Sequence, residues 1–173
     1  TKQTSYDIRS RNIFPFSMEN VVLYLPLWQE DMQGATLLSY APNHHSCAVT
    51  EATAGSTGRT FDATNDYITL TAIQPMPAVG YIGIWAYKAD WAPGVTRTLF
   101  DAGTADGGGS RLGLWIAANN APRLLITVDG VDQVDINGAA LSGAGWKYFE
   151  VLYGLNNTSL WIDLAQIGST DTA

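Results

Sequence analysis

The sequence predicts an all-β protein, built as an antiparallel two-sheet β-sandwich. Strand-like runs that alternate apolar and polar residues recur at short intervals from Gly58 onward, and turn residues separate them. No stretch keeps a 3.6-residue apolar period for three turns, so no long helix is expected. The 173 residues suffice for one domain with a sizeable core, and seven or more short strands joined by hairpins favour two packed sheets.

The chain is expected to consist of an N-terminal arm and one sandwich domain. Residues 1–20 are mostly polar, with Phe14 and Phe16 embedded among them. This arm is predicted either to stay solvated or to dock its two phenylalanines on a neighbouring subunit. The single sandwich domain is predicted over residues 21–173.

The first part of that domain carries the weaker strand signals. Val21–Trp28 is predicted as a core strand, because its apolar run is too short to span a bilayer and is interrupted by Pro26. Residues 29–54 are predicted to be loop with short strands. We therefore expect no insertion of the chain into a membrane.

The second part of the domain is predicted to be a series of hairpins. The dipeptide Asp129-Gly130 favours a tight primed turn, so the strands on either side of it should pair. A last pair is expected from the strands that flank Asn156 and Asn157. The expected strands are Ile82–Tyr87, Thr96–Phe100, Arg111–Ala117, Arg123–Val128, Val131–Ile136, Trp146–Tyr153 and Leu160–Leu164.

Composition narrows the classes of partner. Hydrophobic residues make up 46% of the chain and charged residues only 14%, below the usual share of about 25%. Such a surface suits an extracellular module or a subunit of an assembly. The 16 acidic and 9 basic residues give a net charge of −7 without any Lys/Arg run, so we expect no nucleic-acid partner. Cys47 is the one cysteine, which excludes an internal disulfide and a cysteine zinc site.

One segment carries a family resemblance. In Gly58–Leu70 a polar turn leads into a strand in which Ile68 and Leu70 share one face. The segment resembles the signature G-x-x-F-D-G-x-x-D-Y, followed by Ile or Val, of laminin G-like, concanavalin A-like domains of the "laminin G 3" type. Ala63 stands where the family usually has Gly.

Two later strands extend this resemblance. Trp146–Phe149 is similar to the family pattern W-x-(H/Y)-(V/F), and Leu160–Leu164 to the pattern L-x-(I/V/L)-D-G, with Leu164 in place of Gly. The resemblance, which includes short phage-associated members, implies a jelly-roll sandwich at an extracellular or virion surface. It implies a binding module for a glycan or another cell-surface ligand. The alternative is a structural or decoration subunit of a virion or other extracellular assembly.

The acidic residues do not form a hydrolase pattern. Glycoside hydrolases on this sandwich use two carboxylates about 5 Å apart, usually arranged as E-x-D-x-E on one strand. No glutamate here is followed by acids two and four residues later; the glutamates are Glu19, Glu30, Glu51 and Glu150. Only His44 and His45 offer a base for a triad, and neither lies in a nucleophile motif. We therefore expect no enzyme.

Aromatic residues suggest a surface for a glycan, because sugar rings stack on aromatic planes while neighbouring polar groups bind the hydroxyls. The chain has six Trp and eight Tyr. The alternative for the large aromatics of a sandwich is core or edge packing, and Trp28, Trp146 and Trp161 are assigned to the core. The candidate ligand-binding residues are Trp85, Tyr87, Trp91, Trp115, Gln133 and Asp135.

Two loops offer oxygen ligands of the kind that calcium prefers. One contains Asp62, Asn65 and Asp66, and the other, rich in glycine, contains Asp101 and Asp106. The alternative is that these side chains cap turns by binding backbone N–H groups. Calcium is accordingly a candidate cofactor.

Overall fold

The structure is a computed structural model whose described residues fall into two compact units. The units comprise residues 1–75 and 76–173, and each is described by itself. The described residues are 21–62, 64–70, 78–92, 94–103, 109–154 and 157–171, with the backbone alone for 168–171. No helix among them is long and apolar enough to cross a membrane. The arm expected at residues 1–20 lies outside the described residues, and the single domain expected after it stays a prediction.

The first unit is built from short strands. A three-stranded antiparallel sheet has the order β1-β2-β5, β3 and β4 form a hairpin, and η3 is a single 3-10 turn. Their bounds are Glu30–Met32 (η3), Thr36–Leu38 (β1), Ser46–Thr50 (β2), Thr53–Gly55 (β3), Gly58–Thr60 (β4) and Tyr67–Leu70 (β5). A small core of Met32, Leu37 and Cys47 receives Ile68 and Leu70 from β5, as the alternation of this strand predicts.

The strand predicted over Val21–Trp28 is not formed, and this prediction is wrong. Alternate leucines of the segment do pack against the small core, which explains the apolar pattern. However, the chain turns at Pro26, whose carbonyl accepts the backbone N–H of Gln29 at 2.8 Å. Trp28 lies within this turn with 50% of its surface exposed, so its assignment to the core is also wrong.

Arg59 ties the loops of the first unit together. Its guanidinium group donates hydrogen bonds to the backbone carbonyls of Met32, Gly34 and Ala52. Met32 and Gly34 are 27 and 25 residues from Arg59 in the sequence, and Ala52 is 7 residues from it. A planar fork of donors can satisfy several carbonyls at once, which a lysine cannot do with the same geometry.

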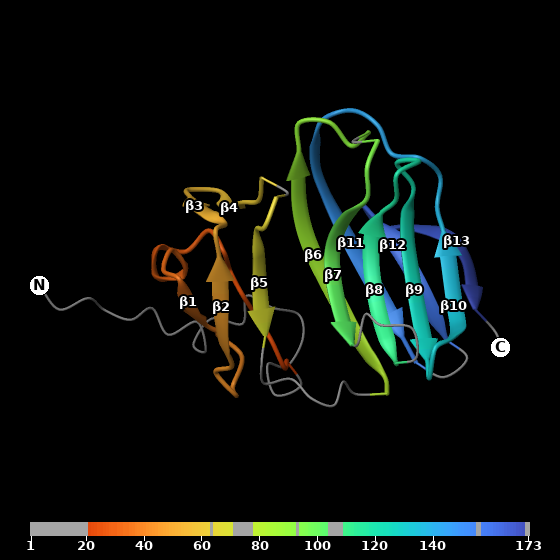
Figure 1. Cartoon of the computed structure of the whole chain (residues 1–173), viewed down its shortest axis with the longest axis horizontal. Coiled ribbons are helices and arrows are strands. Elements are labelled where there is room, and N and C mark those ends of the chain that lie inside the picture. Colours follow the sequence, from red (N-terminus) through yellow and green to blue (C-terminus); the bar gives the residue numbers. More distant parts are fainter. Residues whose placement is uncertain are drawn as a thin grey trace, which may run out of the picture. The chain divides into compact units, whose positions relative to one another are not determined.

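The second unit is a sandwich of two four-stranded antiparallel sheets, with strand orders β10-β9-β8-β7 and β13-β12-β11-β6 (Figure 1). The strands are Gly80–Lys88 (β6), Arg97–Gly103 (β7), Arg111–Ile116 (β8), Pro122–Val128 (β9), Val131–Asn137 (β10), Gly145–Tyr153 (β11), Thr158–Ile162 (β12) and Ala165–Asp171 (β13). The all-β class and the two packed sheets are thereby confirmed. The jelly-roll connection over the whole chain stays a prediction.

The sandwich core is formed by alternate residues of both sheets. Leu114 and Leu124 from one sheet, with Phe149 and Leu160 from the other, are fully or almost fully buried in one cluster. Trp91 completes this cluster from the connection between β6 and β7, and none of its surface is exposed. An apolar layer shared by two sheets is the arrangement expected from the period-two pattern of these strands.

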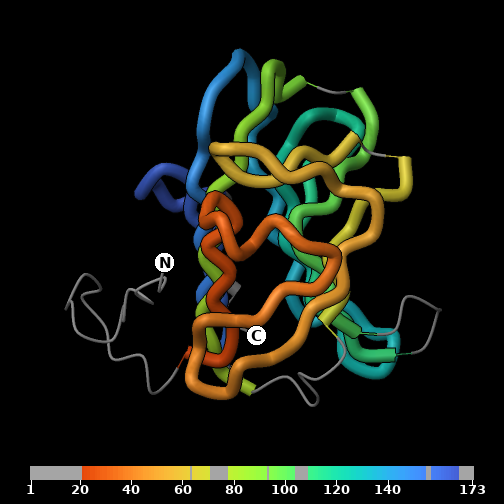
Figure 2. The backbone as a smooth tube through the Cα atoms, turned by 90° about the vertical axis from the view of Figure 1, so that its left-hand side faces the viewer, coloured from red at the N-terminus to blue at the C-terminus, as the bar shows by residue number. Residues whose placement is uncertain are grey.

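Trp91 joins two connections at one end of the sandwich. Its Nε1 donates to the carbonyl of Gly145 at 2.9 Å, and its backbone N–H donates to that of Gly143 at 2.8 Å. The ring lies 5.4 Å from that of Phe149, centroid to centroid. The β6–β7 and β10–β11 connections therefore lie side by side (Figures 1 and 2). Because the ring is closed off from solvent, the prediction that Trp91 binds a ligand is wrong.

Two hairpins share a turn geometry but differ in sequence. Asp129 and Gly130 join β9 to β10 with φ of 49° and 77°, which confirms the predicted primed turn. Asp163 and Leu164 join β12 to β13 with φ of 50° and 68°. Leu164 thus holds a left-handed conformation that favours glycine, while 78% of its surface is exposed.

Replacing Trp91 should destabilise the second unit. We expect Trp91→Ala to lower the free energy of unfolding by about 3–5 kcal/mol, because it removes a fully buried ring and leaves a cavity. Urea denaturation followed by circular dichroism measures this change. The control is Trp85→Ala, at an exposed position, which should cost less than about 1 kcal/mol. Equal losses for the two variants would contradict this account of the core.

Replacing Leu164 by glycine should stabilise the chain. Leu164→Gly relieves the left-handed conformation of a residue with a Cβ atom, so the free energy of unfolding should rise by about 1 kcal/mol. The matched control is Gly130→Ala at the equivalent position of the other hairpin, which should lower it by a similar amount. Thermal unfolding of both variants tests this expectation, and a loss of stability in Leu164→Gly would refute it.

Candidate functional site

The candidate site lies on the outer face of the sheet β13-β12-β11-β6 and is set by the pairing of β6 with β11. The pairing runs without a bulge from Gly80 opposite Tyr153 to Lys88 opposite Gly145. Side chains alternate between the two faces of a sheet. Because Phe149 points into the core, the residues on either side of it in β11 point to the outer face. The outward residues on these two strands are predominantly aromatic.

We call this group of five the aromatic face: Tyr81, Trp85, Tyr87, Trp146 and Tyr148. Four of its members have at least half of their surface exposed, and Trp85 is the most open at 62%. Trp85 stacks on Tyr148 across the strands, with ring centroids 4.8 Å apart and 27° between the planes. Tyr87 and Trp146 form a second cross-strand pair at 5.6 Å and 57°. The rings are thus fixed by one another and remain open to solvent.

A gap at Gly83 lets two tyrosines approach Glu150. A Cβ atom at position 83 would lie 2.5 Å from the hydroxyl oxygen of Tyr148 and 3.2 Å from the ring of Tyr81. Tyr81 donates its hydroxyl proton to Glu150 Oε1 at 2.7 Å. A hydroxyl has one proton to donate, so the bond between the two tyrosine hydroxyls must be donated by Tyr148. The result is a chain of hydrogen bonds that ends on the carboxylate.

Burial, with the hydrogen bonds to Tyr148 and Glu150, raises the pKa of Tyr81 above its ordinary value. Its hydroxyl therefore stays a neutral donor across the physiological range. Glu150 in turn has no Lys, Arg or His nitrogen within ion-pair distance among the described residues. In the described part of the chain, the carboxylate thus has a phenol as its hydrogen-bond donor and no basic side chain as a partner.

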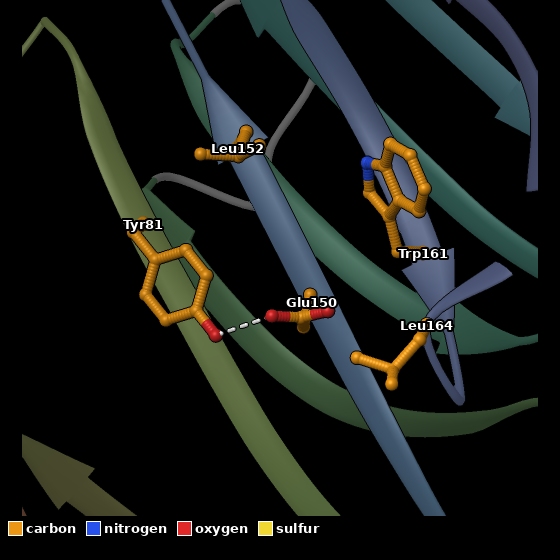
Figure 3. A pocket seen from close by; sticks show the side chains of 5 residues that line it. All are labelled: Tyr81, Glu150, Leu152, Trp161 and Leu164. Carbon is orange, nitrogen blue, oxygen red and sulfur yellow. Dashed lines mark hydrogen bonds between the residues drawn. The ribbon is translucent and has the colours of Figure 1, made fainter. Parts of the chain in front are cut away.

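A shallow hollow of about 260 Å³ surrounds Glu150, and we call it the Glu150 hollow (Figure 3). Tyr81 comes from β6, Glu150 and Leu152 from β11, Trp161 from β12, and Leu164 from the β12–β13 turn. Figure 3 shows the carboxylate between the Tyr81 ring and Leu164. Trp161 is oriented by its Nε1, which donates to Ser159 Oγ at 3.0 Å. The hollow therefore combines one carboxylate with aromatic and aliphatic walls.

The structure divides the predicted ligand-binding residues among different places. Trp85 and Tyr87 belong to the aromatic face, where the alternation of β6 placed them. Trp115 and Asp135 lie on the outer face of the other sheet, on the opposite side of the sandwich. Gln133 is exposed at a bulge of β10, and its Nε2 donates a hydrogen bond to the carbonyl of Val131 at 3.4 Å. One site containing all the predicted residues is therefore excluded.

The sequence interpretation missed most of the site. Trp146 and Trp161 were assigned to the core, but Trp146 is half exposed and Trp161 lines the Glu150 hollow. Tyr148 and Glu150 share the outward side of β11 with Trp146. The alternation of side chains along β11 was the signal that could have placed these residues on one face. It was hard to use, because both faces of the strand carry aromatic residues.

The ring of Trp115 is packed against neighbouring residues of its own sheet. Its ring lies over Gly113, where a Cβ atom would come within 2.2 Å, and the guanidinium carbons of Arg111 and Arg123 lie 5.3 and 5.7 Å from its centroid. Each arginine is itself held by a carboxylate with two hydrogen bonds, Arg111 by Asp101 and Arg123 by Asp135. Trp115 and Asp135, which were predicted to bind a ligand, are thus already occupied by cation–π contacts and an ion pair within the protein.

The predicted calcium ligands also have protein partners. Asp62 Oδ1 accepts the N–H of Thr64 at 2.8 Å, and Asp66 Oδ2 accepts the N–H of Asp62, as in turn-capping side chains. Asn65 is exposed beside them. Asp101 is committed to Arg111, and Asp106 lies outside the described residues. No group of three or more His, Cys, Asp or Glu side chains suited to a metal occurs in the described part of the chain, and calcium binding stays a prediction.

The pair of Arg123 and Asp135 predicts a pH dependence of stability. The hydrogen bonds from Arg123 lower the pKa of Asp135 below its ordinary value of 3.8. The stabilisation is therefore present above that ordinary value and is lost as the pH falls through the lowered pKa. Because both side chains are about one-third exposed, Asp135→Asn should cost at most about 1 kcal/mol at neutral pH. Urea titrations should show this difference vanishing in acid, and a constant difference would contradict it.

Comparisons with known proteins show the fold and leave the family open. No protein-family model matches the chain, and no curated protein matches it. A crystal structure of an S-layer domain-containing protein from Clostridium thermocellum is similar, with a TM-score of 0.51 and 19% sequence identity. The similarity covers 82% of this chain and 69% of that one. At this level of identity the likeness shows a shared fold.

Proposed function

We propose that this chain is a non-catalytic binding module that recognises a glycan through the aromatic face. The observation that supports it is the pair of cross-strand aromatic contacts, Trp85 with Tyr148 and Tyr87 with Trp146, on an exposed sheet. Contiguous exposed apolar surface on a soluble domain marks an interaction site. Rings separated by two residues in a strand are roughly 6–7 Å apart, so several can contact one extended ligand.

Two further observations fit a glycan. Tyrosine and tryptophan present an apolar ring with a polar group at its rim, which suits a ligand whose rings carry hydroxyls at their edges. Glu150 and the hydroxyls of Tyr81 and Tyr148 supply acceptors and donors beside the rings. The Glu150 hollow holds a single carboxylate among its lining residues, whereas hydrolysis of a glycoside requires two. This favours binding without cleavage.

An extracellular location is part of the proposal. The structure with the shared fold belongs to a protein named for an S-layer domain, and this name favours a cell-surface setting. The low charge density and the exposed aromatic residues agree with it. The same name favours a second candidate function, in which the aromatic face is an interface between subunits of an extracellular assembly.

Binding to polysaccharides tests the first proposal. Titration against cellulose, xylan, mannan and chitin, with calcium and with a chelator, should reveal a ligand for the wild-type chain. Trp85→Ala and Trp146→Ala should each raise the dissociation constant about tenfold or more, because each removes an aromatic anchor. Trp28→Ala is the matched control, since Trp28 is as exposed as Trp146 but belongs to the first unit.

Sedimentation velocity separates the two candidate functions. A binding module should sediment as a small species at all concentrations, and the Trp85→Ala variant should behave in the same way. An assembly subunit should form larger particles that Trp85→Ala disperses.

Folded Trp85→Ala and Trp146→Ala variants that bind polysaccharide as tightly as the wild type would refute the glycan proposal.

A further inference from the structure

The Glu150 hollow has an unbalanced charge. The carboxylate lies beside two aromatic rings, those of Tyr81 and Trp161, and two leucines, Leu152 and Leu164. Its described hydrogen-bond donor is the neutral hydroxyl of Tyr81 at 2.7 Å. Elsewhere in this unit, Asp101, Asp135 and Asp163 are each paired with a basic side chain. Glu150 is therefore a carboxylate in largely apolar surroundings whose countercharge is not supplied by the described residues.

A cation is the ligand chemistry that these walls complement. An ammonium group would be attracted by the carboxylate and by the faces of the aromatic rings, and both attractions strengthen where water is partly excluded. The net charge of −7 adds a favourable field for a cation. An anion would meet Glu150 without any basic partner from the described residues to offset the repulsion.

We propose that the Glu150 hollow is a subsite for the protonated amine of an amino sugar. This inference rests on the proposed function, because the aromatic face next to the hollow would hold the neighbouring sugar rings. Tyr81 belongs to both, since its ring lines the hollow and its hydroxyl is bonded to Tyr148 of the aromatic face. A chain of sugars lying along the aromatic face can thus place one amine at the carboxylate.

Leu164 supports the view that the hollow is a built feature. Its side chain lines the hollow from a turn position with φ of 68°, where glycine is favoured. Residues held in sparsely populated backbone conformations cluster at ligand-binding and active sites. With glycine at this position the wall would be missing on that side of the carboxylate.

Three oligosaccharides of equal length and linkage test the subsite. Oligomers of β-1,4-linked glucosamine, N-acetylglucosamine and glucose differ only at the second carbon, which carries an ammonium, an acetamide or a hydroxyl group. Calorimetry in mildly acidic buffer should show the wild type binding the glucosamine oligomer at least about tenfold more tightly than the other two, a difference of about 1.4 kcal/mol. Added salt should reduce this preference and leave the binding of the glucose oligomer unchanged.

Variants separate the subsite from the aromatic face. Glu150→Gln should abolish the preference for the amine while retaining the binding of the glucose oligomer, and Trp85→Ala should weaken all three. Glu51→Gln is the matched control, because it removes the same charge from an exposed position of the first unit. It should keep the preference.

Each contrary result has a distinct meaning. Equal binding of the three oligomers by the wild type, a preference for the acetamide, or a preference retained in Glu150→Gln would overturn the amine subsite and leave the proposed glycan surface standing. Failure of the wild-type chain to bind any of the three would overturn the amine subsite, and the glycan proposal would fall with it only if cellulose, xylan, mannan and chitin are also not bound. Leu164→Gly, which should be more stable than the wild type, should still bind the glucosamine oligomer less tightly; unchanged binding would remove Leu164 from the subsite.

Discussion

The unbroken register between β6 and β11 is the constraint on which the candidate site depends. A slip of one residue would exchange the faces of one strand, bringing Ile84 to the surface and turning Trp85 toward the core. The sandwich core fixes this register, because Phe149 and Val151 are fully buried opposite Ile84 and Ile82. The packing of the interior thus determines which aromatic rings meet on the outer face. Gly83, opposite Glu150, leaves the space in which the tyrosine hydroxyls reach the carboxylate.

The two outer faces of the sandwich differ in whether their charged groups have partners within the protein. On the sheet that contains β8 and β9, the ring of Trp115 is engaged by two arginines, and each arginine is engaged by a carboxylate. On the other sheet the exposed rings contact one another, and Glu150 receives a hydrogen bond without a countercharge from a described residue. A ligand that displaced the ion pairs of the first face would have to replace their hydrogen bonds, whereas the aromatic face offers its groups without such a loss.

Sequence reasoning predicted the local elements well and the spatial grouping poorly. Alternation and turn chemistry act within a few residues, and they identified the β9–β10 hairpin, the buried side of β8 and the outward direction of Trp85. The pairing of β6 with β11 joins segments about sixty residues apart, and no local pattern specifies it. For that reason Trp146, Tyr148 and Glu150 could not be grouped with Trp85. Trp91 was misplaced because its loop position suggested exposure, whereas its indole N–H binds a carbonyl from a distant connection.

The position of Glu150 also bears on the choice between a glycan and a second copy of the chain. An isologous contact centred on the aromatic face would bring the Glu150 side chains of two copies toward the same axis. Both carboxylates would then lose water, and within each copy Glu150 has no ion-pair partner among the described residues. Removing an uncompensated charge from water is strongly unfavourable. A ligand that carries its own cation avoids this cost, so the carboxylate that we propose binds an amino sugar would also disfavour self-association through the same surface.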